Sequence, residues 1–129
     1  MKRRIAREKA LQAMYQIDMS EADPAEALKN VLEDESPDPF LQKLVEGTVA
    51  NLEEIDQEIS KHLERWTIDR LAKVDVSILR IGAYELLYTD DVPQNVVINE
   101  AIEIAKLFGD EKSGKFVNGI LSKVKGEEQ

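Results

Sequence analysis

The sequence predicts an all-α protein, a compact bundle of six or seven helices in a single domain over residues 1–129. Apolar residues recur at the spacing of one helix face along most of the chain, and no segment alternates as a β-strand does. The connections between these segments are about two to six residues long, which favours antiparallel packing of neighbouring helices. A chain of 129 residues is also large enough to bury a hydrophobic core without disulfide bonds.

The first two helices have recognisable boundaries. A first helix is expected from about residue 4 to residue 18, with alanine, methionine and isoleucine side chains on one face. Asp23 then provides an N-cap, Pro24 suits the first helical position, and Glu26 is placed to complete a capping box. The Ser-Pro-Asp-Pro run at residues 36–39 is the clearest break in the chain, so the second helix ends before it.

The middle of the chain predicts a long helical stretch and then a central apolar helix. From residue 40 to residue 63 the apolar spacing stays helical, but Gly47 and a second capping box that begins at Asn51 indicate a bend or a split near residue 50. Residues 67–69 have the pattern of the next helix N-terminus. Residues 74–88 then predict a strongly apolar helix at the centre of the fold.

The last third predicts two helices joined by a short loop that contains glycine. The first begins at Asn95 or Val96 and ends at Phe108, where Gly109 provides the C-cap. The second runs from about residue 113 to residue 124, and residues 125–129 are expected to form a frayed tail.

Two polar side chains need partners within this helical fold. Asn118 is a candidate for a buried hydrogen bond at a helix junction, with contact to a nucleic-acid base as the alternative. Arg80 lies in the apolar run of the central helix, where a cation must be paired. The candidate carboxylates are Glu100, Asp75 and Glu85.

Charge is divided unevenly along the chain. The net charge is −9, yet residues 1–10 carry five cations and one anion, and residues 106–125 carry five cations and two anions. Residues 18–64 carry fourteen acids and three bases. A chain of this kind is repelled by RNA in most orientations and attracted in one. A solvated acidic surface with ordinary basic ends explains the same numbers, so charge alone leaves both interpretations open.

Both basic ends carry the residue types that bind single-stranded RNA. Cations meet phosphates, an aromatic ring stacks on a base, and an amide bonds a base edge. Arg3, Arg4 and Arg7 are three and four residues apart, so one side of a helix displays them together, where they can line a phosphate track. Phe116 also fits a core position by its helical spacing, and that alternative stays open. The predicted RNA-binding residues are Lys2, Arg3, Arg4, Arg7, Lys112, Lys115, Phe116 and Asn118.

Catalysis, cofactors and metal sites find no support in the sequence. There is no cysteine, and the single histidine, His62, is expected on a solvated helix face. Residues 109–115 match the start of a phosphate-binding P-loop, but Phe116 follows where a hydroxyl residue is needed, and a helix precedes where a strand is needed. We therefore expect a protein that is not an enzyme and that holds no cofactor or metal.

The expected cellular compartment follows from three features that the sequence lacks: cysteine, a secretory signal and an apolar membrane span. Without cysteine, the chain suits a reducing environment. The N-terminus is not a secretory signal, and no stretch approaches the roughly 18 apolar residues of a membrane span. The expected setting is the cytoplasm.

The sequence resembles the NusB family of bacterial transcription antitermination factors over nearly its whole length. The first matching group is Arg-Arg-x-Ala-Arg-Glu with Ala-Leu-Gln-Ala-Met-Tyr, within residues 3–15. The second is Val-Asp, Ile-Leu-Arg-Ile and Tyr-Glu-Leu, within residues 74–86. The third includes Val-Pro, Ile-Asn-Glu-Ala-Ile-Glu and Lys-Phe-Val-Asn-Gly, within residues 92–119. The three groups together are specific, although any one alone is weak.

The resemblance implies a helical fold of two three-helix-like halves and a role in transcription. It implies that the protein pairs with NusE, a small-subunit ribosomal protein, and binds the boxA element of nascent ribosomal RNA transcripts. The resulting antitermination complex helps RNA polymerase to read through terminators. By position, the helix that contains Asp75 faces the protein partner. The residues implied to contact RNA are Arg3, Arg4, Arg7, Lys115 and Phe116.

The alternative function is an acidic helical adaptor that binds other proteins and does not contact RNA. Substitution of Arg4 and Phe116 by alanine separates the two: lost RNA binding at an unchanged melting temperature supports an RNA-binding protein. A fall of several degrees instead marks Phe116 as a core residue. The sequence has no heptad seam that sets an oligomeric state, so a monomer and a homodimer both fit it.

Overall fold

The computed structural model describes residues 1–127, and side chains up to residue 124. Within that range the chain is helical and contains no strand, which confirms the predicted all-α class. There are seven α-helices and one short 3₁₀ turn. In chain order these are α1 (Arg3–Ser20), α2 (Pro24–Leu32), α3 (Pro39–Ala50), α4 (Leu52–Ser60), η1 (Ile68–Arg70), α5 (Lys73–Tyr88), α6 (Gln94–Phe108) and α7 (Ser113–Glu127).

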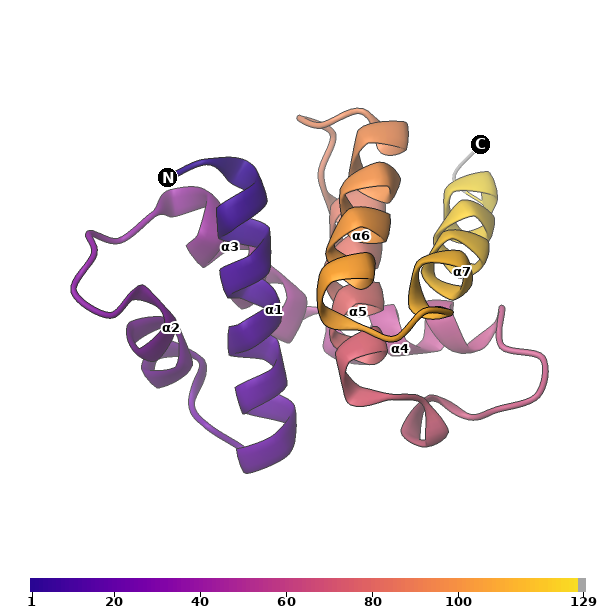
Figure 1. The fold of residues 1–129 in the computed structure, drawn as a ribbon, viewed down its shortest axis with the longest axis horizontal. Helices are drawn as coiled ribbons and strands as arrows, with labels where there is room; N and C mark the ends of the chain where they lie inside the picture. Colours follow the sequence, from indigo (N-terminus) through magenta and orange to yellow (C-terminus); the bar gives the residue numbers. More distant parts are fainter. Residues whose placement is uncertain (128–129) are drawn as a thin grey trace.

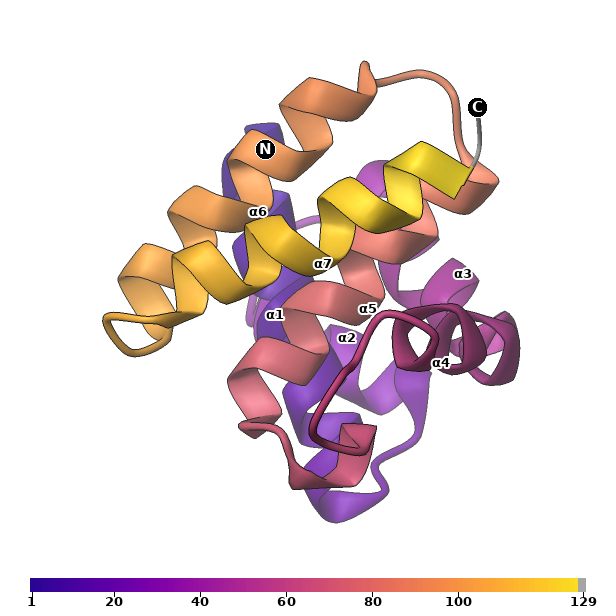
Figure 2. The ribbon, with the colours of Figure 1, turned by 90° about the vertical axis from the view of Figure 1, so that its right-hand side faces the viewer.

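Two groups of helices stand side by side (Figure 1). The first group is α1, α2 and α3, with α1 packed against both of the others. In the second group, α5 packs against α4, α6 and α7, and Figure 2 shows α7 in front of α5 with α6 above it. Helix α5 also packs against α1 and α3, so both groups share one hydrophobic core. The second group has four α-helices rather than three, because the stretch from residue 40 to residue 63 is divided between the two groups.

The division near residue 50 is confirmed, but it is made by different chemistry from the expected capping box. The Asn51 side-chain amide donates to the Gly47 carbonyl at 2.8 Å, and the Asn51 backbone N–H donates to the same oxygen at 3.2 Å. Asn51 therefore closes the C-terminal end of α3. Helix α4 begins after it without a side-chain N-cap.

Two aspartates cap helices, and only the first of them was predicted to do so. Asp23 accepts a hydrogen bond from the Ala25 backbone N–H at 3.2 Å, and Pro24 is the first residue of α2. Asp38 accepts from the Leu41 N–H at 2.9 Å, so a proline at the first helical position follows an acidic cap in α3 as well. In both helices the cap satisfies a backbone donor that has no partner within the helix.

Three other boundaries differ from the prediction in detail. Gly109 ends α6 with an extended backbone (φ −96°) rather than a left-handed one; a Cβ at this position would lie 2.6 Å from the Ser113 Cβ. The expected helix N-terminus at residues 67–69 is the single turn η1, and α5 begins later, at Lys73. Helix α7 continues to Glu127, past the start of the expected frayed tail, while residues 128–129 lie outside the described range.

Helix α5 is the centre of the core, and twelve of its sixteen residues are buried. Its one arginine, Arg80, donates to the two Asp56 carboxylate oxygens at 2.9 and 2.8 Å and to Asp18 at 3.5 Å. Arg80 thus faces α4 and α1 rather than α6. The predicted partners were wrong for that reason: the guanidinium does not pair with Glu100, Asp75 or Glu85.

Candidate nucleic-acid interface

The first turn of α1 exposes two of the predicted cations. Lys2 is exposed at the N-cap position, and about half of the Arg3 side chain is exposed. The Arg3 guanidinium lies 4.4 Å from the centre of the Phe40 ring and 3.7 Å from the Asp91 carboxylate. The cation–π contact holds this side chain against α3 while leaving it accessible.

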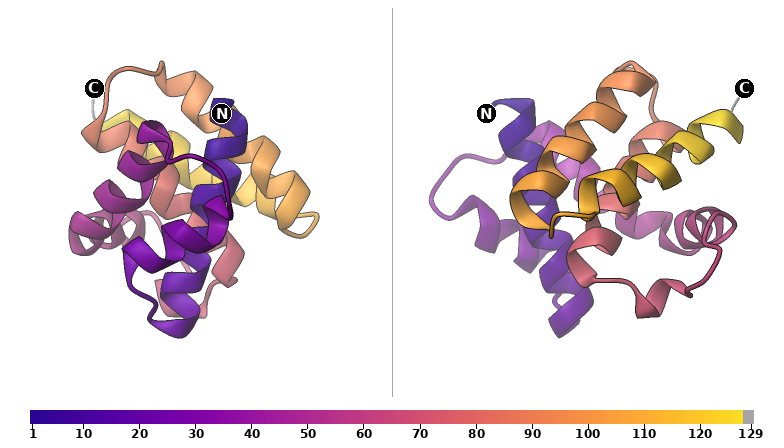
Figure 3. Two further views of the ribbon diagram at one scale, coloured as in Figure 1. Left: turned by 90° about the vertical axis from the view of Figure 1, so that its left-hand side faces the viewer. Right: turned by 45° about the vertical axis from the view of Figure 1, so that its right-hand side comes forward.

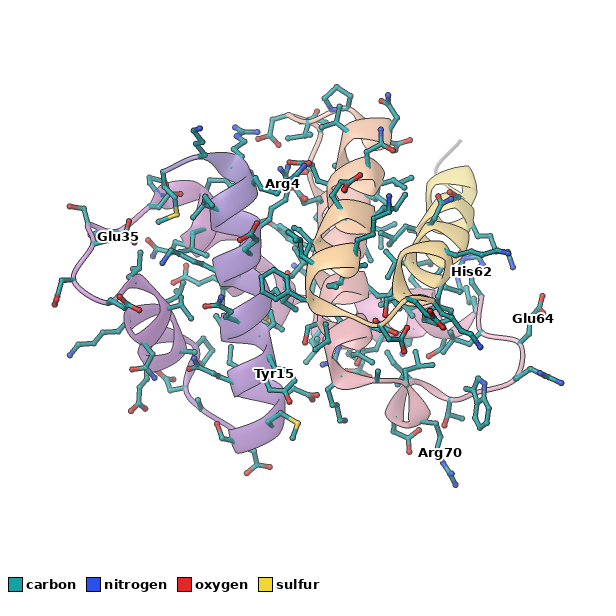
Figure 4. All side chains as sticks on the ribbon, viewed as in Figure 1. Arg4, Tyr15, Glu35, His62, Glu64 and Arg70 are labelled. Carbon is teal, nitrogen blue, oxygen red and sulfur yellow. The ribbon has the colours of Figure 1, made fainter. Side chains whose placement is uncertain are left out.

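Arg4 is paired across to α6. Its Nε donates to the Glu100 carboxylate at 2.9 Å, and its Nη2 also donates to that oxygen. Figure 4 shows Arg4 between α1 and α6. This hydrogen bond raises the pKa of Arg4 and lowers the pKa of Glu100, so both groups are charged at neutral pH. The side chain of Arg4 is nevertheless 41% exposed.

Arg7 lies inside the protein, with only 4% of its surface exposed. Its Nε and Nη2 each donate to the Glu85 carboxylate at 2.9 Å, and Glu100 lies 3.6 Å from its Nη1. The expectation that Arg7 lines an exposed phosphate track is corrected by this burial. The row of arginines does follow one side of α1, but that side passes beneath the second helix group one turn after Arg4.

The second group of predicted RNA-binding residues lies at the start of α7. The helix points the members of this group in different directions. Lys112 and Lys115 are exposed, and neither forms an ion pair with another described residue. Phe116 packs partly against the core. Asn118 is two residues further on and therefore faces a different direction, where its Oδ1 accepts a hydrogen bond from the Ser122 hydroxyl at 3.0 Å. The ring and the amide do not form one recognition unit.

Helix α6 separates the two basic groups. Figure 1 and the right-hand view of Figure 3 show α1 and α7 on opposite sides of α6. A ligand that touches both the arginines of α1 and the lysines of α7 must therefore cross α6.

A groove lies between α7 and the segment that follows α4, and we call it the α7 groove. It has a volume of about 340 Å³ and is lined by residues 62–66 and, on α7, by Lys115, Phe116, Gly119, Ile120 and Lys123. Trp66, which the sequence did not mark as a site residue, is 59% exposed beside this groove. No periodic pattern marks that residue, and the available signal was a lone tryptophan in a polar segment.

His62 is also placed differently from the prediction. Only 11% of its side chain is exposed, and its Nε2 lies 3.6 Å from the Glu58 carboxylate. The charged neighbours of His62 in the sequence suggested a solvated face, but the chain turns after α4 and brings the ring against α7, as Figure 4 shows. His62 therefore belongs to the inner wall of the α7 groove.

Asp75, expected to mark the helix that faces a protein partner, is buried at the start of α5. Burial raises the pKa of the Asp75 carboxyl, against a smaller lowering by the Ser113 hydroxyl, and the nearby Asp110 charge raises it further. One oxygen of Asp75 has no hydrogen-bond partner in the described part of the chain. The Asp75 carboxylate is therefore largely covered by neighbouring helices, and a protein partner on the helix that contains it stays a prediction.

Other types of site are not found in the described residues. They contain no group of three or more potential metal ligands. None of the helices in this range combines the length and apolar character that crossing a bilayer requires.

The fold and its charge pattern define an all-helical protein of net charge −9 that nevertheless exposes neighbouring cations at the start of α1 and at the start of α7, as in proteins that bind nucleic acid. Comparison with known proteins supports this class of protein and identifies the family. The chain belongs to the NusB family, whose sequence profile matches residues 4–125.

The similarity extends over whole chains. The transcription antitermination protein NusB of Bacillus licheniformis is 54% identical over 127 residues, which is 98% of each chain. The structure of Thermotoga maritima NusB superposes with a TM-score of 0.91 at 39% identity, covering 98% of this chain and 92% of that one. The structure of antitermination factors NusB and NusE in complex with double-stranded RNA has a TM-score of 0.88 at 36% identity, covering 97% and 96%. The curated relatives are thus named as transcription factors, not as enzymes.

Proposed function

We propose that this protein is a transcription antitermination factor that binds boxA single-stranded RNA of nascent ribosomal RNA transcripts together with NusE. The complex promotes read-through of terminators by RNA polymerase. The observation that carries the proposal is the likeness over almost the full chain to a NusB that was solved with NusE and double-stranded RNA. The relatives with 54% identity, named as transcription antitermination proteins, support the same role.

The exposed cations support an RNA contact that begins at α1. Arg3 is held by the Phe40 ring, so its guanidinium group is already ordered before a phosphate arrives. Less conformational entropy is then lost when RNA binds. Lys112 and Lys115 extend the positive surface on the far side of α6.

The acidic remainder of the chain supports a basic protein partner. The net charge is −9, and residues 18–64 carry fourteen acids against three bases. A basic ribosomal protein is attracted to such a surface, and it also supplies cations that RNA can share. We therefore expect NusE and RNA each to tighten the binding of the other, with a coupling free energy of about 1–3 kcal/mol.

The test is a titration of labelled RNA of about 12 nucleotides, read by fluorescence anisotropy at two salt concentrations. A boxA-like single strand, a scrambled strand and a duplex are compared, with and without NusE. Four phosphate contacts on a single strand predict a salt slope of about −3. Preference for the boxA strand with this slope supports the proposal. No binding to any of these RNAs, even with NusE present, leaves the protein adaptor as the better explanation.

Matched variants assign the contacts. Arg3→Ala and Lys112→Ala should each reduce the salt slope by about 0.7, because each removes one phosphate contact. Lys43→Ala is the control, since Lys43 is an exposed lysine of α3 outside both basic groups. Equal losses in all three variants would mean that the RNA senses only the net charge. An in vitro transcription assay with a terminator downstream of boxA then measures read-through directly.

A further inference from the structure

Cations line both walls of the α7 groove. Lys115 and Lys123 are eight residues apart on α7, which places them about 12 Å apart along the helix axis and within a quarter turn of each other. Arg65 contributes a third cation from the opposite wall. Glu64 is the one acid among the lining residues. It is 85% exposed and lies 3.8 Å from Lys123, so it neutralises little of the positive charge of the groove. The groove is therefore positive on a protein that is strongly negative.

Flat apolar surface accompanies these charges. Trp66 is 59% exposed, in a chain whose large apolar side chains are mostly buried. Phe116 keeps part of its ring accessible, and Ile120, one turn further along α7, continues the apolar floor. An exposed ring next to cations is the arrangement that holds single-stranded nucleic acid, because every base has a face that stacks.

Gly119 keeps the middle of the groove open. A Cβ built at this position would meet no atom within 4 Å, so packing does not require a glycine there. Alanine would favour the helix more than glycine does. The missing side chain leaves space between Lys115 and Lys123, where a flat ring can approach the helix.

We propose that the α7 groove binds one nucleotide of single-stranded RNA, with its base stacked on Trp66 and its flanking phosphates paired with Lys115 and Lys123. This inference rests on the proposed function, because it adds a subsite to the RNA assigned to the basic ends of the chain. The subsite lies on the far side of α7 from Arg4, as the positions of Arg4 and His62 in Figure 4 show. RNA that starts at α1 therefore continues over α6 and past α7. A phosphate group carries the negative charge that neutralises cations on both walls of the α7 groove.

The single tryptophan provides the measurement. Trp66 is the only tryptophan of the chain, so its emission reports on this groove alone. Unlabelled boxA-like RNA of about 12 nucleotides is titrated while Trp66 emission is recorded, and anisotropy of the labelled strand reports total binding in parallel. We expect quenching with the same midpoint as the anisotropy change. Binding seen by anisotropy with unchanged emission overturns the subsite and leaves the proposed function intact. No binding in either signal overturns both.

Two variants test the groove without touching the core. Trp66→Ala removes the stacking ring, and Gly119→Leu fills the open space. Each should weaken RNA binding about tenfold, the loss expected when one stacked base is displaced. Met19→Ala is the matched control, because Met19 is a large apolar side chain, 54% exposed, near the C-terminal end of α1 and outside the groove, and this variant should keep the wild-type affinity. Wild-type affinity in both Trp66→Ala and Gly119→Leu overturns the proposal.

A protein occupant is separated by the same signal. Purified NusE is titrated without RNA, and Trp66 emission is recorded for the wild-type protein and for Gly119→Leu. No change in emission supports an RNA subsite. Quenching by NusE alone that Gly119→Leu abolishes would show that the groove docks the protein, and would overturn the proposal.

Discussion

Arg7 and Glu85 form a buried ion pair with two hydrogen bonds, and this pair ties the first helix group to the second. Both donor–acceptor distances are 2.9 Å, and the two residues are 4% and 3% exposed. The guanidinium also lies 5.1 Å from the centre of the Phe40 ring. Charge, hydrogen bonds and ring contacts together satisfy a group that would otherwise be costly to bury.

Arg7→Ala should destabilise the fold severely. Removing one partner of a buried pair leaves Glu85 charged and unpaired, a loss of about 3–5 kcal/mol in the free energy of unfolding, measured by urea denaturation. The double variant Arg7→Met, Glu85→Leu removes both charges and keeps apolar volume, so it should recover most of the loss. A cost below about 1 kcal/mol for Arg7→Ala would mean that water enters and solvates Glu85.

Glu100→Gln should strengthen RNA binding. The carboxylate of Glu100 occupies the Arg4 guanidinium, so its neutralisation frees a cation for phosphate and should make the salt slope steeper by up to about 0.7. Glu103→Gln is the control on the same helix, because Glu103 is half exposed and pairs with Lys106 at 3.6 Å. Titration of labelled RNA compares the two. Equal affinities for both variants would place Arg4 outside the RNA interface.

Two helical glycines should respond in opposite directions to alanine. A Cβ on Gly47 would lie 2.3 Å from Cζ of Tyr84, so Gly47→Ala should cost about 1–3 kcal/mol through overpacking between α3 and α5. Gly119 has open space, so Gly119→Ala should stabilise α7 by up to about 1 kcal/mol. Thermal melts of both variants check this pair. A rise in melting temperature for Gly47→Ala would contradict the close contact of that helix with Tyr84.

Asp75 should make stability fall as the pH rises. The pKa of Asp75 in the folded protein lies above the ordinary value of an aspartate. Its favourable contribution to stability is therefore complete at a pH below the ordinary pKa, and it is lost as the pH rises through the pKa of the folded state. The variant Asp75→Asn has no carboxyl group at this position, so it does not lose stability in this way as the pH rises. Its free energy of unfolding, relative to the wild type, should therefore increase from about pH 3 towards neutral pH.

The control for this pH dependence is Asp69→Asn. Thr67 lowers the pKa of Asp69, the opposite direction, and the group is fully exposed. Its pH dependence should therefore be opposite in sign and weak. Urea unfolding from pH 3 to pH 7 measures both variants, and a difference between Asp75→Asn and wild type that stays constant with pH would refute the role given to burial.

Helices were predictable from the sequence because their determinants are local. Apolar spacing marked every α-helix, and the acidic cap followed by proline marked the start of α2, whereas Asp38 and Pro39 were recognised only as part of a break before α3. The exact chemistry at Asn51 was not predictable, since the same amide can cap the helix before it or the helix after it. The partners of Arg80 were missed for a related reason: periodicity gives a helix face, but not which neighbour covers that face.

The candidate site was less predictable because exposure depends on packing between distant segments. Arg3, Arg4 and Arg7 look equivalent in the sequence, yet only Arg7 becomes buried, because α5 and α6 cover that part of α1. Trp66 had no periodic pattern to mark it, and its neighbourhood forms only when the segment after α4 meets α7. Motifs locate charges along the chain, whereas grooves are made by contacts between elements.

The two arginines of α1 pair with carboxylates that lie far along the chain, and this has a consequence for how the protein is made. Arg7 and Arg4 find their carboxylates 78 and 96 residues later in the chain. At about 5–20 residues per second, translation supplies Glu85 roughly 4–16 s after Arg7. During that interval α1 lacks the carboxylates that hold it in the folded protein. The two helix groups can therefore be joined through these ion pairs only after α5 and α6 have been made.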